Sequence, residues 1–184
     1  MLNVTSMSAG AAVSYHIHME KDGQKEDYYS KEGEGQWHGA GAENLGLTGA
    51  VDGSDFKALA HGYDPKTGEA LTQNSGEKER VAGYDLTFSA PKSVSIAMAV
   101  ADPKNAALIQ AAHDKAVATA LQFVQDKQAQ TRLGHGGLTT EKTALTIAVF
   151  NHQTSRQQDP QIQRTPHAPA IPSALRRSAI TLTN

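Results

Sequence analysis

The sequence predicts an α+β fold, a two-layer sandwich in which helices pack on a mainly antiparallel central sheet. Two segments read as strands, residues 84–89 and 144–150, because they are rich in β-favouring residues. Two helical segments, residues 91–100 and 103–128, lie between them. Tandem strand–helix–strand repeats, which indicate a parallel sheet, do not occur between these segments. With 184 residues, the chain can bury the core of one ordinary domain.

The amino-terminal part of the chain carries one short helix followed by an irregular stretch. Ser8 can cap a helix over residues 8–19, which places Tyr15 on its second turn. An acidic and glycine-rich stretch follows, with Tyr28 and Tyr29 in its middle.

The middle of the chain alternates loops with regular elements. Residues 52–60 (DGSDFKALA) are typical of a second short helix, and residues 61–83 are polar and turn-rich, which predicts a loop or irregular hairpin. Pro91 suits the first position of the helix that follows the strand over residues 84–89. The helix after it begins at Asp102-Pro103, and its apolar residues approximate one face: Ala106, Ile109, Ala116, Ala120, Phe123 and Val124.

The carboxy-terminal part begins with a strand and then loses its periodicity. Residues 144–150 (ALTIAVF) form a strand that delivers His152 at its end. From Arg164 onward the pattern fits neither strand nor helix, and four prolines fall between Pro160 and Pro172. We therefore expect an ordered part over residues 1–163, a tail over residues 164–184, and a fold that is incomplete at its carboxy-terminal end.

Composition limits the classes of protein that fit. The net charge of −2 divides into −6 for residues 1–80 and +4 for residues 81–184, and neither half has the dense basic stripe of a non-specific nucleic-acid binder. The absence of cysteine excludes disulfides and thiolate metal sites. The sequence shows neither a signal peptide nor an apolar run of membrane-spanning length. We expect a soluble, intracellular protein without membrane insertion.

Three features carry possible chemistry, and each has a structural alternative. The tyrosines Tyr15, Tyr28 and Tyr29 become nucleophiles for phosphorus only if a metal and a base favour the phenolate, because the pKa of tyrosine is about 10; otherwise they pack amphipathically. Asp85 interrupts an apolar strand and either orients a histidine ligand or points to solvent. His152 is either a metal ligand or a structural histidine.

Two motifs together indicate a family. GYDLTFSAPKSVS and NHQTSR…DPQ, in this order and at this separation, resemble the TrwC/TraI-type (MobF) conjugative relaxases, which nick plasmid DNA at the transfer origin. The resemblance covers about residues 8–163 and includes WHGAGAENLGLTGAV and AHDKAV. It implies a relaxase domain of the HUH type that acts on single-stranded DNA in the bacterial cytoplasm, with relaxosome and secretion-system proteins as partners.

The resemblance also implies roles for the tyrosines. Tyr15 matches the first tyrosine of the family's amino-terminal pair, which attacks the scissile phosphate and stays linked to the 5′ end. The second member of that pair is replaced by His16. Tyr28 and Tyr29 match the second pair, which is used for a further strand transfer.

Further roles follow for Asp85 and His152. Asp85 matches the acid that orients a metal-binding histidine and helps to activate the nucleophile. His152 matches the first of three histidines that hold a divalent cation, with Mg²⁺ or Mn²⁺ expected. Such a cation absorbs charge on the oxygens of the scissile phosphate.

The match breaks at the other two histidines. After DPQ and an apolar residue the family has His-Thr-His-Ala, whereas this chain has Gln163 to Pro166, so that Thr165 takes the third ligand position. Gln163 and His167 are possible substitute ligands. Deleting the third base of CAC ACG CAC GCC gives codons for Gln-Arg-Thr-Pro, which is this sequence. We hypothesise a one-base deletion or reading error at codon 163, with residues 164–184 out of frame.

Three functions remain open from the sequence. The first is a relaxase, a DNA strand transferase that uses Tyr15 to give a 5′-phosphotyrosyl intermediate. The second is an inactive fragment that at most binds single-stranded DNA. The third is a broken-gene product without function.

Overall fold

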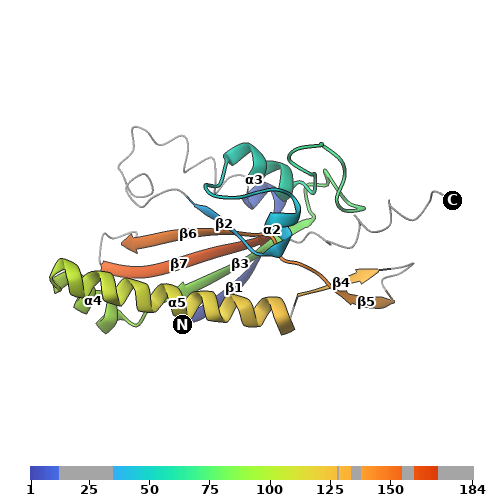
Figure 1. Ribbon diagram of the computed structural model, residues 1–184. Helices are drawn as coiled ribbons and strands as arrows, with labels where there is room; N and C mark the ends of the chain where they lie inside the picture. Colours follow the sequence, from blue (N-terminus) through green and yellow to red (C-terminus); the bar gives the residue numbers. More distant parts are fainter. Residues whose placement is uncertain (13–34, 128, 134–137, 155–159, 170–184) are drawn as a thin grey trace.

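The fold is built around an antiparallel sheet, shown in Figure 1. The structure is a computed structural model that describes residues 1–12, 35–127, 129–133, 138–154 and 160–169, with the backbone alone for residues 132–133 and 152–154. The strands are β1 Leu2–Ser8, β2 Gln36–His38, β3 Val81–Ser89, β4 Gln130–Leu133, β5 Thr139–Lys142, β6 Ile147–Thr154 and β7 Pro160–Pro169. The helices that begin and end within the described residues are α2 Ala40–Asn44, α3 Gly53–Ala60, α4 Lys92–Val100 and α5 Pro103–Lys127.

The central sheet has five strands in the order β1-β3-β7-β6-β2, and all its pairings are antiparallel. Strands β4 and β5 pair separately. Helices α4 and α5 pack on one face of the sheet, and α2 and α3 pack on the other, here called the α3 face. The predicted α+β fold with helices on an antiparallel sheet is therefore confirmed, and α2 and α3 add cover on the second face.

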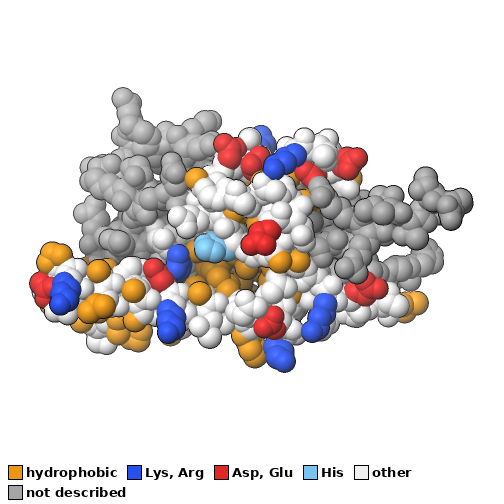
Figure 2. Space-filling view, viewed as in Figure 1, with side chains coloured by type: hydrophobic (Ala, Val, Ile, Leu, Met, Phe, Trp, Pro, Cys, Tyr) orange, Lys and Arg blue, Asp and Glu red, His pale blue; other side chains and the backbone are white. Residues whose placement is uncertain are grey.

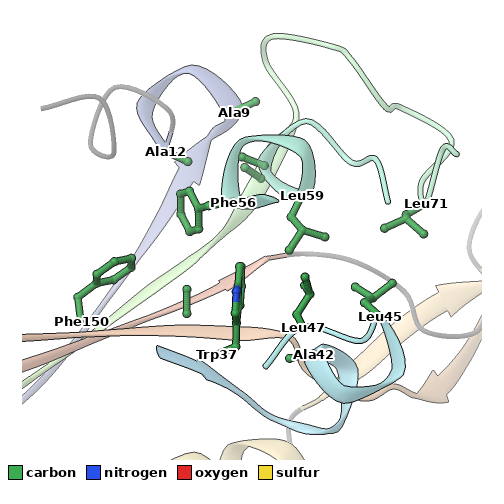
Figure 3. Packing of buried hydrophobic residues seen from close by; sticks show 13 residues of the cluster. Ala9, Ala12, Trp37, Ala42, Leu45, Leu47, Phe56, Leu59, Leu71 and Phe150 are labelled. Atoms are coloured by element: carbon green, nitrogen blue, oxygen red, sulfur yellow. The ribbon is translucent and has the colours of Figure 1, made fainter. Parts of the chain in front are cut away.

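Each face of the sheet contributes to a separate apolar cluster. On the α3 face, Phe56 and Leu59 of α3 pack with Trp37, Ala148 and Phe150 (Figure 3). On the other face the buried residues are Leu86, Ile147, Val149 and Ala168, with Leu121 of α5 packed against them. The residues of β6 alternate between the two clusters because successive strand side chains point to opposite faces.

Local sequence explains where the helices begin. Asp52 caps α3 by accepting hydrogen bonds from the backbone N–H of Ser54 at 2.8 Å and of Asp55 at 3.3 Å. Asp102 likewise accepts from the N–H groups of Lys104 and Asn105 at the start of α5. These caps agree with the helix starts that the sequence predicted.

Gln125 of α5 fixes the chain just before β6. Its side-chain Nε2 donates to the carbonyl of Thr143 at 2.9 Å, and its Oε1 accepts from the N–H of Leu145 at 2.7 Å. One side-chain amide thus satisfies a backbone acceptor and a backbone donor two residues apart. The start of β6 is held against the helix in this way.

Several boundaries differ from the prediction. Strand β1 occupies residues 2–8, and residues 9–12 are helical, so the predicted helix begins at the end of a strand; its residues from 13 onward lie outside the described part. Strand β6 begins at Ile147 rather than Ala144 and extends to Thr154, so His152 lies within it rather than after it. Strands β1, β2, β4, β5 and β7 were not predicted.

The expectation that no regular structure follows residue 163 is wrong for residues 164–169. They continue β7, which pairs with β3 on one side and β6 on the other. Flanking strands and burial of residues 165–169 outweigh the weak local pattern. Residues 170–184 lie outside the described part, and the domain boundary stays a prediction.

Pro166 is an unusual residue for a central strand. Its pairing with Val149 on β6 belongs to a continuous register, but the β3–β7 register lacks the two pairs between Asp85↔His167 and Phe88↔Arg164. Proline has no N–H to give to a sheet ladder, and it occurs almost only at edges, strand starts or bulges. We infer that the missing donor of Pro166 faces β3.

Candidate functional site

The predicted ligand positions meet on two adjacent strands. His152 on β6 is the cross-strand partner of Gln163 on β7, and Phe150 is the partner of Thr165. Positions 152, 163 and 165 share one face, because strand side chains alternate and Phe150 belongs to the α3-face cluster. The register therefore brings the three positions of the expected metal site together on the α3 face.

The two substituted positions are joined by a chain of side-chain hydrogen bonds. Gln161 Nε2 donates to Gln163 Oε1 at 3.2 Å, and Gln163 Nε2 donates to Thr165 Oγ1 at 3.3 Å. The carbonyl oxygen of Gln163, the atom that would bind a cation, is thus engaged along its own strand. Together with a threonine hydroxyl it makes a weaker donor set than two imidazoles.

His167 lies on the same face, two residues beyond Thr165 and four beyond Gln163. It follows Gln163 by four strand residues, which corresponds to about 13 Å. Its ring is 1 % exposed and packs against the rings of Phe150 at 5.3 Å and Phe56 at 6.0 Å. Ligands of one ion must lie within about 2–2.5 Å of it. His167 therefore does not replace the missing ligand in this arrangement.

Asp85 also belongs to the α3 face. It is half-buried on β3, directly across from His167 on β7 and Thr5 on β1. Thr87 Oγ1 donates to its Oδ1 at 3.1 Å, which helps to hold the carboxylate in place. The structure thus places Asp85 on the sheet face that carries positions 152, 163 and 165, but in register with His167 rather than with Gln163.

The tyrosines Tyr15, Tyr28 and Tyr29 lie outside the described residues. The described residues that flank this gap both lie on the α3 face. Ala12 is buried in the cluster around Phe56, and a Cβ at Gly35 would clash with the ring of Phe150. The chain therefore leaves and re-enters the described part on the face of the candidate site.

The charged groups of β7 and α5 meet on the opposite face. Arg164 pairs with Asp114 of α5 at 2.9 Å. Burial lowers the pKa of His113, and the neighbouring carboxylate of Asp114 offsets part of this effect. Burial and the charge of Arg164 lower the pKa of His38. The guanidinium of Arg164 therefore lies on the α5 side of the sheet rather than on the α3 face.

The described part of the chain does not provide a ready metal centre. Among its side chains, no group of three or more histidine, cysteine, aspartate or glutamate residues is placed to hold an ion. The side chain of His152 is not among those described. The residues present at positions 163 and 165 therefore do not fit the three-histidine site that the resemblance implies.

Sequence reasoning missed the neighbours that shape the site. Phe56 and Phe150 enclose His167, and Gln161 engages Gln163. The alternation of Gln161, Gln163 and Thr165 was a possible signal of a polar strand face, but it stands among prolines that argued against a strand. Within the described residues, no helix is long and apolar enough to cross a membrane.

The fold and the row of polar positions define an α+β protein whose candidate site lies on the α3 face of an antiparallel sheet. A family model described as TrwC relaxase matches residues 9–164. The chain therefore belongs to the TrwC relaxase family.

Relatives and solved structures agree with this assignment. The chain is 40 % identical over 161 residues to the multifunctional conjugation protein TraI of Escherichia coli, and 39 % identical to that of strain K12. It is similar to the conjugative relaxase TrwC solved in complex with oriT DNA in a copper-bound form, at a TM-score of 0.73 and 36 % identity. A metal-free TrwC–oriT complex gives a TM-score of 0.68 and 35 % identity.

The chain spans only part of these relatives. The TraI match covers 84 % of this chain but 8 % of TraI. The copper-bound TrwC match covers 92 % of this chain and 57 % of that chain. Activities and partners of the longer proteins are therefore proposals for this chain.

Proposed function

We propose that this chain is the DNA-processing part of a conjugative relaxase, which acts on single-stranded plasmid DNA at a transfer origin in the bacterial cytoplasm. The observation that carries the proposal is the register of β6 and β7, which gathers positions 152, 163 and 165 on the face that also holds Asp85. The similar TrwC structures contain oriT DNA, which supports DNA as the substrate. Relaxosome and secretion-system proteins are the partners expected for such a domain.

The proposed chemistry is a transesterification. The phenolic oxygen of Tyr15 attacks the scissile phosphorus, the bond to the 3′ oxygen breaks, and a 5′-phosphotyrosyl link and a free 3′ hydroxyl result. Asp85 helps to take up the phenolic proton. Tyr28 and Tyr29 perform a later transfer of the same kind. A divalent cation, with Mg²⁺ or Mn²⁺ proposed, would absorb charge on the phosphate oxygens. His152 is the one family ligand in sequence that would hold it, and Gln163 and Thr165 fit it poorly.

A second candidate function is single-stranded DNA binding without cleavage. It is favoured by the substitutions at Gln163 and Thr165, which leave His152 as the one family ligand in sequence, and by Pro166 in the central strand. The family match ends at residue 164, which supports a change of reading frame near codon 163. Sequencing the gene across codons 160–170 tests that frame directly: an intact frame with nothing family-like in the shifted frame rules the deletion out.

An origin oligonucleotide separates the candidates. The purified chain is incubated with a labelled single-stranded origin sequence and Mg²⁺ or Mn²⁺, and adducts are resolved on a denaturing gel. A covalent adduct that disappears in Tyr15→Phe supports the relaxase. Salt-sensitive binding without an adduct supports the binding fragment. If the chain forms no adduct and does not bind the oligonucleotide, both candidate functions are contradicted. That result supports a product without function.

Restoring the ligand positions is a second, independent test. We expect Gln163→His combined with Thr165→His to raise Zn²⁺ affinity at least tenfold over the original chain, because imidazole suits Zn²⁺ better than the amide and hydroxyl oxygens that it replaces beside position 152. Calorimetric titration with the metal alone measures this. His167→Gln in the restored chain is the matched control and should leave the affinity unchanged, since His167 lies about 13 Å along the strand. Equal affinities of the original and restored chains would refute the assignment of the ligand positions.

A further inference from the structure

An apolar hollow lies on the sheet face opposite the candidate site, between β1, α4 and α5. Its volume is about 480 Å³. An engineered cavity of about 150 Å³ binds one benzene ring, so this hollow can take several large apolar side chains. The apolar residues that line it include Leu2, Phe88, Val94, Ile109, Ala116 and Val117.

Helix α4 extends the apolar surface beside the hollow. Its sequence KSVSIAMAV is mainly apolar, yet Ser95 is its one buried residue. Ile96 is 48 % exposed and Val100 is 81 % exposed, and Leu2 on β1 is 49 % exposed. Figure 2 shows hydrophobic side chains gathered over α4 and the adjoining part of α5. A helix of this composition is normally buried, and contiguous apolar surface marks an interaction site.

The chemistry of the lining restricts the occupant. Neither lysine nor arginine lines the hollow, and its polar side chains are Ser89 and His113. The terminal ammonium of Met1 is the cation at the rim, and it donates to the carbonyl of Ser89 at 2.6 Å. Burial lowers the pKa of His113, which favours its neutral form. A nucleic-acid strand requires cations for its phosphates. An apolar polypeptide segment fits this lining better than DNA or a charged metabolite.

The comparisons indicate where such a segment comes from. More than two fifths of the similar TrwC chain has no counterpart in this chain, although 92 % of this chain is matched. We propose that the hollow and the exposed side of α4 are the docking surface for an apolar segment of that further part of a relaxase domain. This inference rests on family membership and does not depend on whether the chain cleaves DNA.

Binding between two separate polypeptides tests the proposal. The probe is the part of the TrwC relaxase chain without a counterpart here, produced separately and mixed with this chain. We expect a one-to-one complex by size-exclusion chromatography with light scattering. Leu2→Lys, which places a charge at the rim, and Val94→Trp, which fills the hollow, should each weaken the complex at least tenfold. Phe123→Lys is the matched control, because Phe123 is 59 % exposed on α5 but does not line the hollow.

The remaining outcomes overturn the proposal. They are the absence of a complex, equal weakening by the control, and self-association of this chain that Leu2→Lys abolishes. The last result would assign the surface to a second copy. Thermal unfolding of each variant identifies any that lose their fold. Val94→Trp fills the hollow and Leu2→Lys places a charge at its rim, so one folded variant is enough to test the docking surface. DNA-binding assays on the same samples report the proposed function separately.

Discussion

Replacing Pro166 with valine should stabilise the protein, although proline lies at the centre of the sheet. Pro166 is fully buried in β7, and the β3–β7 register is interrupted beside it. Valine is similar in size, favours strands and supplies the missing N–H, which continuation of the β3–β7 register would place opposite Leu86.

The size of the effect follows from two opposed terms. Pairing a buried backbone group that lacks a partner contributes about 1–3 kcal/mol. Removing proline makes the unfolded chain freer, which costs about 0.4–1 kcal/mol. The net gain is therefore about 1 kcal/mol, which corresponds to a rise in Tm of about 2–4 °C for a domain of this size.

Calorimetry or circular dichroism measures the change in Tm, and hydrogen exchange follows the new amide of residue 166. The matched control is Pro160→Val, because Pro160 is the first residue of β7, where proline is tolerated. We expect the control to change stability by less than about 0.5 kcal/mol. A Tm that falls for Pro166→Val, a gain of the same size for Pro160→Val, or fast exchange at residue 166 would refute the reasoning.

Three further predictions concern the same sheet. Gly83→Ala should destabilise the protein by about 1–3 kcal/mol in urea unfolding, because its Cβ would clash with the carbonyl of Ala168, and a loss below 0.5 kcal/mol would contradict that close approach. Phe56→Ala should lower the free energy of unfolding by about 3–5 kcal/mol, whereas Leu108→Ala, at an exposed residue, should lower it little. Equal losses would show that α3 does not hold together the apolar cluster on the α3 face. Burial lowers the pKa of His113 in the folded state, so stability should be complete above the unfolded pKa of about 6.5 and decrease as the pH falls toward the lowered folded value. His113→Gln should reduce that slope in Tm measured from pH 7.5 to 5, and an unchanged slope would assign it to other groups.

The sequence predicted those elements whose pattern is local. The segment DGSDFKALA indicated α3, Pro91 indicated the start of α4, and Asp102-Pro103 with an apolar face indicated α5. Alternation located most of β3. It failed where pairing decides the structure: β1 is an exposed edge strand without a strong apolar pattern, and the end of β7 is extended because β3 and β6 flank it. Tertiary context outweighs local preference in such strands.

The candidate site was predictable in kind but not in geometry. The motifs identified Asp85 and position 152, and the family pattern identified positions 163 and 165. The four-residue distance of His167 from Gln163 excludes it as a substitute only once both are known to lie in one extended strand. The aromatic surroundings of His167 depend on α3, which no sequence motif connects with β7.

Gln125 illustrates how little freedom one partly buried junction leaves to mutation. Its amide satisfies a carbonyl and an N–H of the segment before β6, so the replacement must both donate and accept at the same reach. Glutamate lacks the donor, lysine lacks the acceptor, and asparagine is one methylene shorter. Position 125 should therefore tolerate no other amino acid without loss, and α5 serves as the template against which the starting point of β6 is set.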